Sequence, residues 1–390
     1  MKKIEMLVVS FSLMGILAAC GNSHSTLKTD ADNNSAGTPN TTNEIADNNN
    51  STESTTIDTN GMDDASSGID NNETTETTDV NVTTGTEETV VNTYKVFKTG
   101  EERSLLDGDD GALRVGAARS YIKNGNIVID KITSLKWQDN ETGRGDFTDA
   151  VKYCQNLVVD GVSGWRVPTL KELQTILDLG KSPKIDPIFS SAARGKFWSS
   201  NEYPYDSNNM AYYLDFSRGF SANYGEREDF LKSNRYAVRC VKGKDQRPES
   251  HFVSSGDIVT DTATDLMWED TSHIEKRMSV EEGINYCKSL NLGGYDDWRL
   301  PNINELNTLS DVTHYDPSTV SVFKNRMKIG TENSSSHYRA ANFWSSTYYG
   351  SSVKEDQTID YYRTYNERDG TSHRCRDYLG MHIRCVRGGK

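Results

Sequence analysis

The chain has 390 residues, of which only 34% are hydrophobic, and its formal net charge is −14. So small a hydrophobic fraction excludes a wholly globular chain and predicts that part of it is unfolded. The acidity belongs to residues 21–92, which hold fourteen Asp and Glu against the single Lys28, whereas residues 93–390 are close to neutral and lack the basic surface that nucleic-acid binding requires.

The first 20 residues have the pattern of a secretory signal. Two lysines are followed by an apolar core over residues 6–17, which is too short to cross a bilayer. The ending Leu-Ala-Ala-Cys20 resembles the lipobox of bacterial lipoproteins, which implies that Cys20 carries the lipid and that the membrane is a partner through this anchor. Gly21, in place of Asp, implies outer-membrane or cell-surface placement in the bacterial envelope. The alternative is an ordinary signal peptide with a chance cysteine.

Residues 21–92 consist largely of Ser, Thr, Asn, Asp and Glu, with few aliphatic residues and no aromatic ones. Such a segment cannot bury enough apolar surface to offset the entropy of ordering it, which predicts a disordered linker.

Aromatic and branched residues return near residue 93, where a short strand is expected. The segment Asp107–Gly111 has the clustered carboxylates that calcium prefers. Asp-Gly clusters are, however, typical of turns, and the distal Glu of a calcium-binding loop is missing. We therefore expect no metal, and calcium binding by this segment stays an alternative.

From here the chain contains two copies of one pattern, residues 93–244 and residues 245–390. Each copy first predicts a hairpin, Gly125–Trp137 or Gly256–Trp268, with Leu and Trp two residues apart on one face of the second strand. A helix follows, with Cys154 or Cys287 on its apolar face.

The most similar stretch of the two copies is Trp165–Leu173 and Trp298–Leu306. Its proline ends an extended segment, and Thr169 or Asn302 then caps a second helix together with a glutamate three residues later. Glu172 and Glu305 could be proposed as catalytic acids, but the capping box explains both. The preceding arginine is expected to pair with carbonyls or a carboxylate. No catalytic residue is therefore predicted.

Each copy continues with Phe-Trp-Ser-Ser, a variable tyrosine-rich stretch and a closing Arg-Cys-Val strand. The second copy has an insertion, expected around residues 325–339. Tyrosine rings suit the faces of sugars, although they could equally fill the core of the loops. The candidate ligand-binding residues are Tyr203, Tyr205, Tyr348 and Tyr349.

Each copy also has one helix cysteine and one closing-strand cysteine. In an exported protein we expect Cys154 to pair with Cys240 and Cys287 with Cys385, each bridge stabilising its domain by about 4 to 5 kcal/mol in the chain-entropy model. Cys375 has no counterpart in the first copy, so it is a free thiol, an intermolecular link or a competitor for Cys385.

Both copies have the same motifs in the same order: the hairpin, the cysteine helix, the Trp-Arg-Val/Leu-Pro helix, the Phe-Trp-Ser-Ser strand and the Arg-Cys-Val ending. This order of motifs resembles the Lcl C-terminal domain family over residues 94–390. The resemblance implies an α+β fold: two tandem C-type-lectin-like domains, each with two helices on small antiparallel sheets, after the disordered tether. It also implies adhesion to glycosaminoglycans or other polysaccharides.

Three classes of function remain at this point. The first is a surface-displayed module that binds carbohydrate or another extracellular polymer, with avidity from two linked sites. The second is an envelope component that binds proteins of the same cell. The third is an enzyme similar to the formylglycine-generating enzymes, which need a pair of reactive thiols that the expected bridges would consume. No cofactor is expected.

Overall fold

The computed structural model describes residues 93–190, 195–221, 227–327 and 341–389. The signal segment and the expected tether lie outside the described residues, as does most of the insertion expected in the second copy. The described residues belong to one compact unit. None of their helices is long and apolar enough to cross a membrane.

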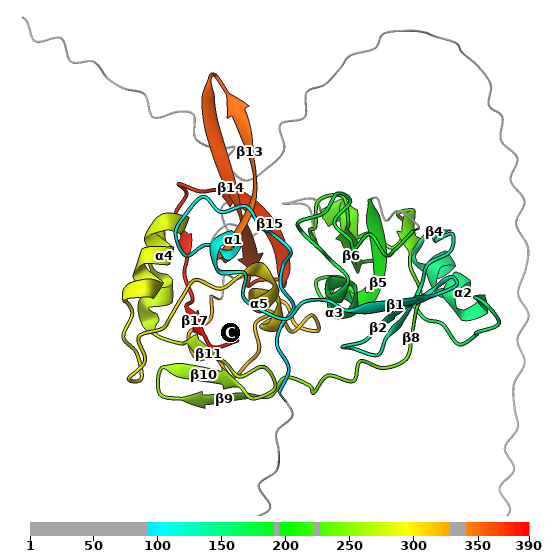
Figure 1. The fold of residues 1–390 in the computed structure, drawn as a ribbon, viewed down its shortest axis with the longest axis horizontal. Coiled ribbons are helices and arrows are strands. Elements are labelled where there is room, and N and C mark those ends of the chain that lie inside the picture. The colour runs from blue at the N-terminus through cyan, green and yellow to red at the C-terminus, as the bar shows by residue number, and fades with distance from the viewer. Residues whose placement is uncertain (1–92, 191–194, 222–226, 328–340, 390) are drawn as a thin grey trace, which may run out of the picture. The chain divides into compact units, whose positions relative to one another are not determined.

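Both copies have the expected α+β architecture of two helices and two small sheets (Figure 1). The helices of the first copy are α2 (Phe147–Asn156) and α3 (Leu170–Thr175), and those of the second are α4 (Val280–Ser289) and α5 (Ile303–Thr308). A one-turn helix, α1 (Asp110–Leu113), precedes them.

The first copy has strands in the orders β1-β2-β3-β8 and β4-β7-β5-β6. Their bounds are β1 (Tyr121–Asn124), β2 (Ile127–Asp130), β3 (Lys136–Gln138), β4 (Gly143–Gly145), β5 (Lys196–Glu202), β6 (Ala211–Asp215), β7 (Tyr236–Val238) and β8 (Val241–Lys242). A 3₁₀ turn, η1 (Arg227–Phe230), lies between β6 and β7.

The second copy has the orders β17-β11-β10-β9 and β12-β16-β13-β14-β15. Their bounds are β9 (Phe252–Ser255), β10 (Ile258–Asp261), β11 (Leu266–Glu269), β12 (Arg277–Met278), β13 (Asn342–Lys354), β14 (Gln357–Asn366), β15 (Thr371–Arg376), β16 (Met381–His382) and β17 (Val386–Arg387). The turn η2 (Ser272–Glu275) precedes β12.

The expected hairpins are β2–β3 and β10–β11, each antiparallel. Trp137 and Trp268 pair across them with Val128 and Val259, and all four side chains are completely buried. Leu135 and Leu266 are buried as well, so the Leu and Trp that both copies share in this pattern are core residues.

The first helix ends at Asn156, and Val158, two residues beyond this end, is 60% exposed. The strand expected near residue 94 is reduced to a single bridge between Phe97 and Ala117. We call residues 94–117 the N-terminal segment.

The N-terminal segment packs on both copies. The Tyr94 amide donates to the carbonyl of Ala263 in the second copy, at 2.8 Å. The Leu179 amide of the first copy donates to the carbonyl of Thr99, at 2.7 Å. The N-terminal segment, which precedes β1 of the first copy, thus joins that copy to the second.

Candidate functional site

The two bridges expected from cysteine spacing are present. Cys154 joins Cys240 and Cys287 joins Cys385, each linking the long helix of its copy to the residue directly before the closing strand, β8 or β17. Cys375 is fully buried, and because Cys287 already pairs with Cys385, Cys375 does not compete for Cys385.

The four candidate tyrosines differ in how far their side chains are exposed to solvent. Tyr203 and Tyr348 are each only 2% exposed, and their hydroxyls donate to the carboxylates of Asp369 and Asp360. Their rings belong to the core and offer no face to a ligand in this structure. Tyr205 is 42% exposed, but the Arg227 guanidinium lies 3.9 Å from its ring centroid.

Tyr349 is half-buried and stacks on Phe220 of the first copy, with ring centroids 5.1 Å apart. Binding by Tyr205 and Tyr349 stays a prediction.

The carboxylates of the Asp107–Gly111 segment already have protein partners. Asp109 caps α1 and accepts a hydrogen bond from the Tyr362 hydroxyl, and Asp110 accepts from the hydroxyls of Thr99 and Thr347. Asp107 pairs with Lys288 at 2.6 Å. These contacts account for the cluster as a junction between the N-terminal segment and the second copy.

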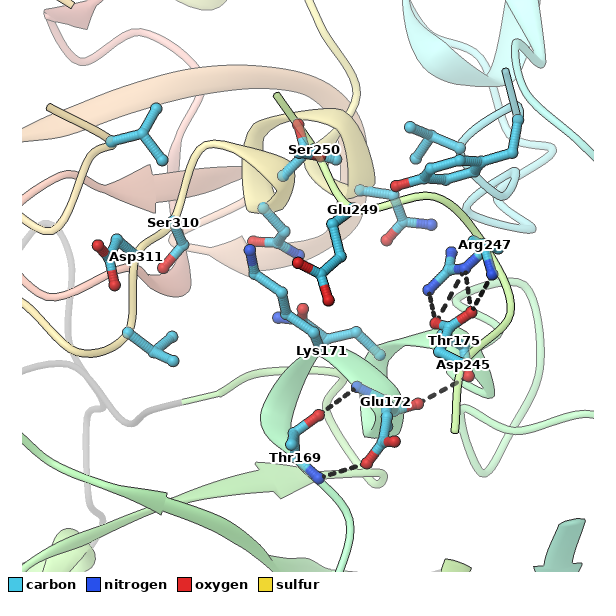
Figure 2. Close-up of a pocket in the computed structure, with 18 of the residues that line it drawn as sticks. Thr169, Lys171, Glu172, Thr175, Asp245, Arg247, Glu249, Ser250, Ser310 and Asp311 are labelled. Carbon is cyan, nitrogen blue, oxygen red and sulfur yellow. Dashed lines mark hydrogen bonds and ion pairs between the residues drawn. The ribbon is translucent and has the colours of Figure 1, made fainter. Parts of the chain in front are cut away.

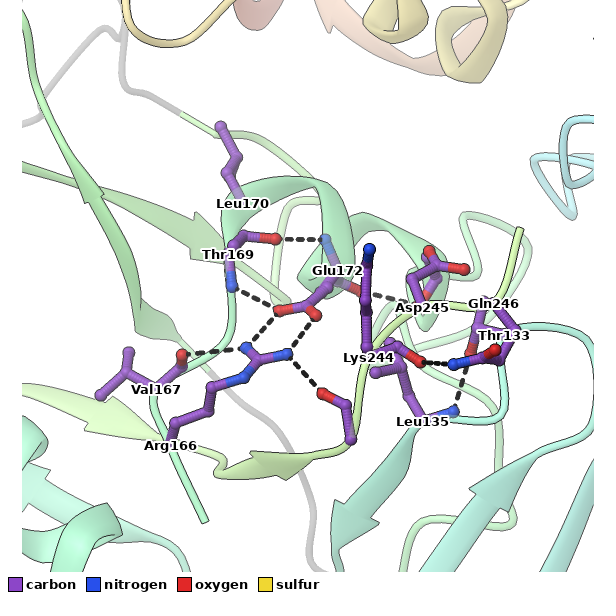
Figure 3. A network of polar contacts seen from close by, with 12 residues as sticks. Thr133, Leu135, Arg166, Val167, Thr169, Leu170, Glu172, Lys244, Asp245 and Gln246 are labelled. Atoms are coloured by element: carbon purple, nitrogen blue, oxygen red, sulfur yellow. Dashed lines mark hydrogen bonds and ion pairs between the residues drawn. The ribbon is translucent and has the colours of Figure 1, made fainter. Parts of the chain in front are cut away.

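The Trp-Arg-Val/Leu-Pro motif forms the same polar network in both copies. In the first copy the Arg166 guanidinium makes two hydrogen bonds to Glu172, at 2.5 and 2.7 Å, and the Glu172 carboxylate also accepts from the Thr169 amide (Figure 3). Arg299 and Glu305 repeat this pairing at 2.6 and 2.7 Å. Both glutamates complete capping boxes, as the sequence predicts.

The outer sides of these two equivalent helices line one cavity of about 620 Å³ (Figure 2). Lys171, Gln174 and Thr175 of α3 occupy the positions that Asn304, Asn307 and Thr308 occupy in α5. The connection between the copies, residues 244–252, and residues 94–97 of the N-terminal segment complete the wall. The cavity therefore exists only where both copies and the N-terminal segment meet.

Among the cations that line the cavity, Lys171 is the one that no described protein group neutralises by contact. Its side chain reaches from α3 into the cavity, toward the space between Glu249 and the Ser310–Asp311 segment (Figure 2). It is exposed, and it has no hydrogen-bond or ion-pair partner among the described residues. The walls of the cavity nevertheless remove part of its hydration, which lowers its pKa, while the negative charge of Asp311 acts in the opposite direction.

Two carboxamide oxygens of α5 are also unpartnered. The Asn304 amide nitrogen donates to the carbonyl of Phe97 at 3.0 Å, which leaves its Oδ1 without a hydrogen-bond donor among the described residues. The Oδ1 of Asn307 also has no hydrogen-bond donor among the described residues. Both residues are more than nine-tenths buried and both line the cavity. Buried acceptors without a donor are rare because each costs about 1 to 3 kcal/mol.

The other charged groups of the cavity have partners. Arg247 and Asp245 pair at 2.6 Å, and Asp311 accepts from the Thr313 hydroxyl and contacts the His314 ring. Glu249 lies only 3.8 Å from Lys244, but both side chains are more than four-fifths exposed to water. Among the described lining groups, Lys171 therefore lacks a counter-ion in contact. Three buried oxygens lack a hydrogen-bond partner, namely Oδ1 of Asn304, Oδ1 of Asn307 and Oγ of Ser310.

This site was not predicted from the sequence. Lys171 and Asn304 lie on the polar sides of their helices, where a charged or amide side chain normally faces solvent. The only available signal was that the most similar stretch of the two copies differs at that position, lysine in one and asparagine in the other.

The comparisons with known proteins fit the observed duplication. The family model for the Lcl C-terminal domain matches residues 126–242 and again residues 257–387. Together these matches cover more than half of the chain. No curated protein matches the sequence.

Proposed function

Because the chain belongs to the Lcl C-terminal domain family and carries its domain twice, we propose that it is a surface-anchored binding module for carbohydrate or another extracellular polymer. A lipid on Cys20 would hold it in the bacterial envelope, and residues 21–92 would carry the paired domains away from the membrane surface. No catalytic step is part of this proposal.

The observation that carries the proposal is the cavity between α3 and α5. It combines one unpaired ammonium group, unpartnered carboxamide oxygens and the hydroxyls of Thr175 and Thr308 with apolar walls from Phe252 and Val320. A few converging polar groups in a concave, partly apolar site are typical of small-ligand recognition. A saccharide, with many hydroxyls and an apolar ring face, matches this mixture.

A glycan and matrix-polymer array probed with residues 21–390 tests the proposal. The array compares the wild type with Gln174→Trp, which fills the cavity from α3, and with Ile122→Trp, an exposed position of β1 that does not line the cavity. We expect the wild type and Ile122→Trp to bind the same glycans and Gln174→Trp to lose at least tenfold in affinity.

Equal binding by the wild type and Gln174→Trp would place the ligand elsewhere. Capture of proteins from the same cell, with no glycan or matrix polymer bound, would favour the envelope-component alternative.

A further inference from the structure

We propose that the cavity recognises a uronic acid residue: the Lys171 ammonium pairs with the sugar carboxylate, and the Oδ1 atoms of Asn304 and Asn307 accept hydrogen bonds from its hydroxyls. The inference rests on the proposed carbohydrate-binding function and narrows it to one ligand chemistry. It concerns the carboxylate of the sugar and excludes sulfate esters as the recognised group.

The charge of the ligand follows from the pairing of the cavity's own groups. Arg247 is neutralised by Asp245, whose contact at 2.6 Å involves side chains that are 16% and 25% exposed. Glu172 is occupied by Arg166 and by the cap of α3. Of the three cations that line the cavity, Lys171 is the one without a counter-ion in contact among the described residues, so a ligand that supplies one anion completes the site.

The number of charges limits the ligand further. Sulfated polysaccharides are bound by rows of basic residues, because several sulfates must be neutralised together. Here one ammonium stands opposite the carboxylates of Glu249 and Asp311, which would repel additional anionic groups. A single carboxylate per bound sugar satisfies Lys171 without bringing a second negative charge against these two residues.

The carboxamide oxygens of Asn304 and Asn307 determine which groups the ligand must carry beside its carboxylate. Each is buried and can only accept, so a bound ligand must present hydrogen-bond donors to both. The ring hydroxyls of a uronic acid are donors at fixed positions relative to its carboxylate. Methyl esterification removes the charge while keeping those hydroxyls, which makes the ester a matched control for the role of Lys171.

Because the two copies differ at equivalent positions, the cavity should bind a sugar in one orientation. Lys171 in α3 and Asn304 in α5 are equivalent positions on opposite walls, so only one wall offers a cation. A uronic acid would therefore bind with its carboxylate toward the first copy and its hydroxyls toward the second. Lys171 is the residue that determines specificity, and Asn304 and Asn307 are the residues that position the sugar.

Titration calorimetry with residues 21–390 tests the inference. The probes are oligomers of galacturonic, mannuronic, guluronic and glucuronic acid, the methyl ester of whichever oligomer binds, its neutral hexose counterpart, and heparin. We expect at least one uronic acid oligomer to bind, and its methyl ester and the neutral oligomer to bind at least tenfold more weakly.

The variants separate charge from folding. Lys171→Met is expected to lose at least tenfold in affinity for the acid but not for the ester, whereas Lys171→Arg retains binding within about threefold. Thermal denaturation should show no loss of stability in Lys171→Met, because the lowered pKa of Lys171 means that its charged form is disfavoured by folding.

Equal affinity for acid and ester, preference for heparin, or full binding by Lys171→Met would overturn the inference. If neutral sugars bind and Gln174→Trp prevents it, the inference fails while the proposed function holds. If no saccharide binds at all, both fail.

Discussion

Arg166 and Arg299 make the same two hydrogen bonds to a glutamate, but they do so at different depths. The Arg299 and Glu305 side chains are 6% and 2% exposed, whereas the Arg166 side chain is 42% exposed. Breaking a buried ion pair leaves an unpaired charge in the protein interior, while an exposed arginine can turn to water. Equivalent residues of the two copies should therefore differ in their contribution to stability.

We predict that Glu305→Ala lowers the free energy of unfolding by about 3 to 5 kcal/mol, because Arg299 loses the carboxylate that it contacts and α5 loses half of its capping box. Glu172→Ala should cost only about 1 to 2 kcal/mol, mostly through the cap of α3. Urea denaturation of the two variants measures the difference. Equal costs would show that burial does not decide the strength of this pair.

These glutamates also show what sequence can and cannot supply at this scale. The spacing Thr169–Glu172 predicts a capping box because the contact is local, and the structure has it. That Lys171, the residue between them, lies in a cavity depends on segments more than 70 residues away in the chain. No local pattern carries that information.

At the scale of elements, the N-terminal segment contributes a buried acid to the junction with the second copy. Asp110 is 3% exposed, and its Oδ2 accepts from Thr99 at 2.5 Å and from Thr347 at 2.9 Å. Burial raises the pKa of Asp110 to about 6, although the hydrogen bonds from the two hydroxyls act in the opposite direction and lower it. The folded state thus binds this proton more readily than the unfolded state does.

A raised pKa gives a defined dependence of stability on pH. The contribution of Asp110 is fully present below its unfolded pKa of about 3.8 and is lost as the pH rises through its folded pKa of about 6. Asp110→Asn keeps an oxygen acceptor for both hydroxyls but cannot ionise. We predict that this variant gains up to about 3 kcal/mol relative to the wild type between pH 4 and pH 7.

Chemical denaturation of both proteins across that pH range measures the gain. A stability difference that stays constant with pH would contradict the raised pKa of Asp110.

The sequence predicts the helix starts and the hairpins better than the helix ends. Helix starts and the hairpins follow from capping residues and alternation, which are local. Helix ends have no such local signal, since α2 and α3 stop at Asn156 and Thr175 although apolar residues continue beyond them. Leu177 is buried outside the helix, so tertiary packing rather than helical periodicity explains its position.

At the scale of the described chain, the two copies share a polar interface. The hydroxyls of Tyr203 and Tyr212 donate to Asp369 of the second copy, at 2.9 and 2.6 Å. The Arg363 guanidinium, 1% exposed, donates to the carbonyl of Gly219 in the first copy at 2.6 Å. Separating the copies would leave these buried groups without their partners, which is costly.

We therefore predict that the two copies unfold together. Scanning calorimetry of residues 21–390 should give one transition whose calorimetric and van't Hoff enthalpies agree, because neither copy keeps its buried groups satisfied alone. Two resolved transitions would show that the copies are independent and that the cavity can open without unfolding.

Hydrogen exchange of residues 21–390, with and without the saccharide selected on the array, shows whether the ligand binds in the cavity that both copies and the N-terminal segment build. We predict added protection in α3, in α5 and in residues 244–252 at the same ligand concentration. Protection confined to one copy, or to the exposed end of the β13–β14 hairpin, would contradict it.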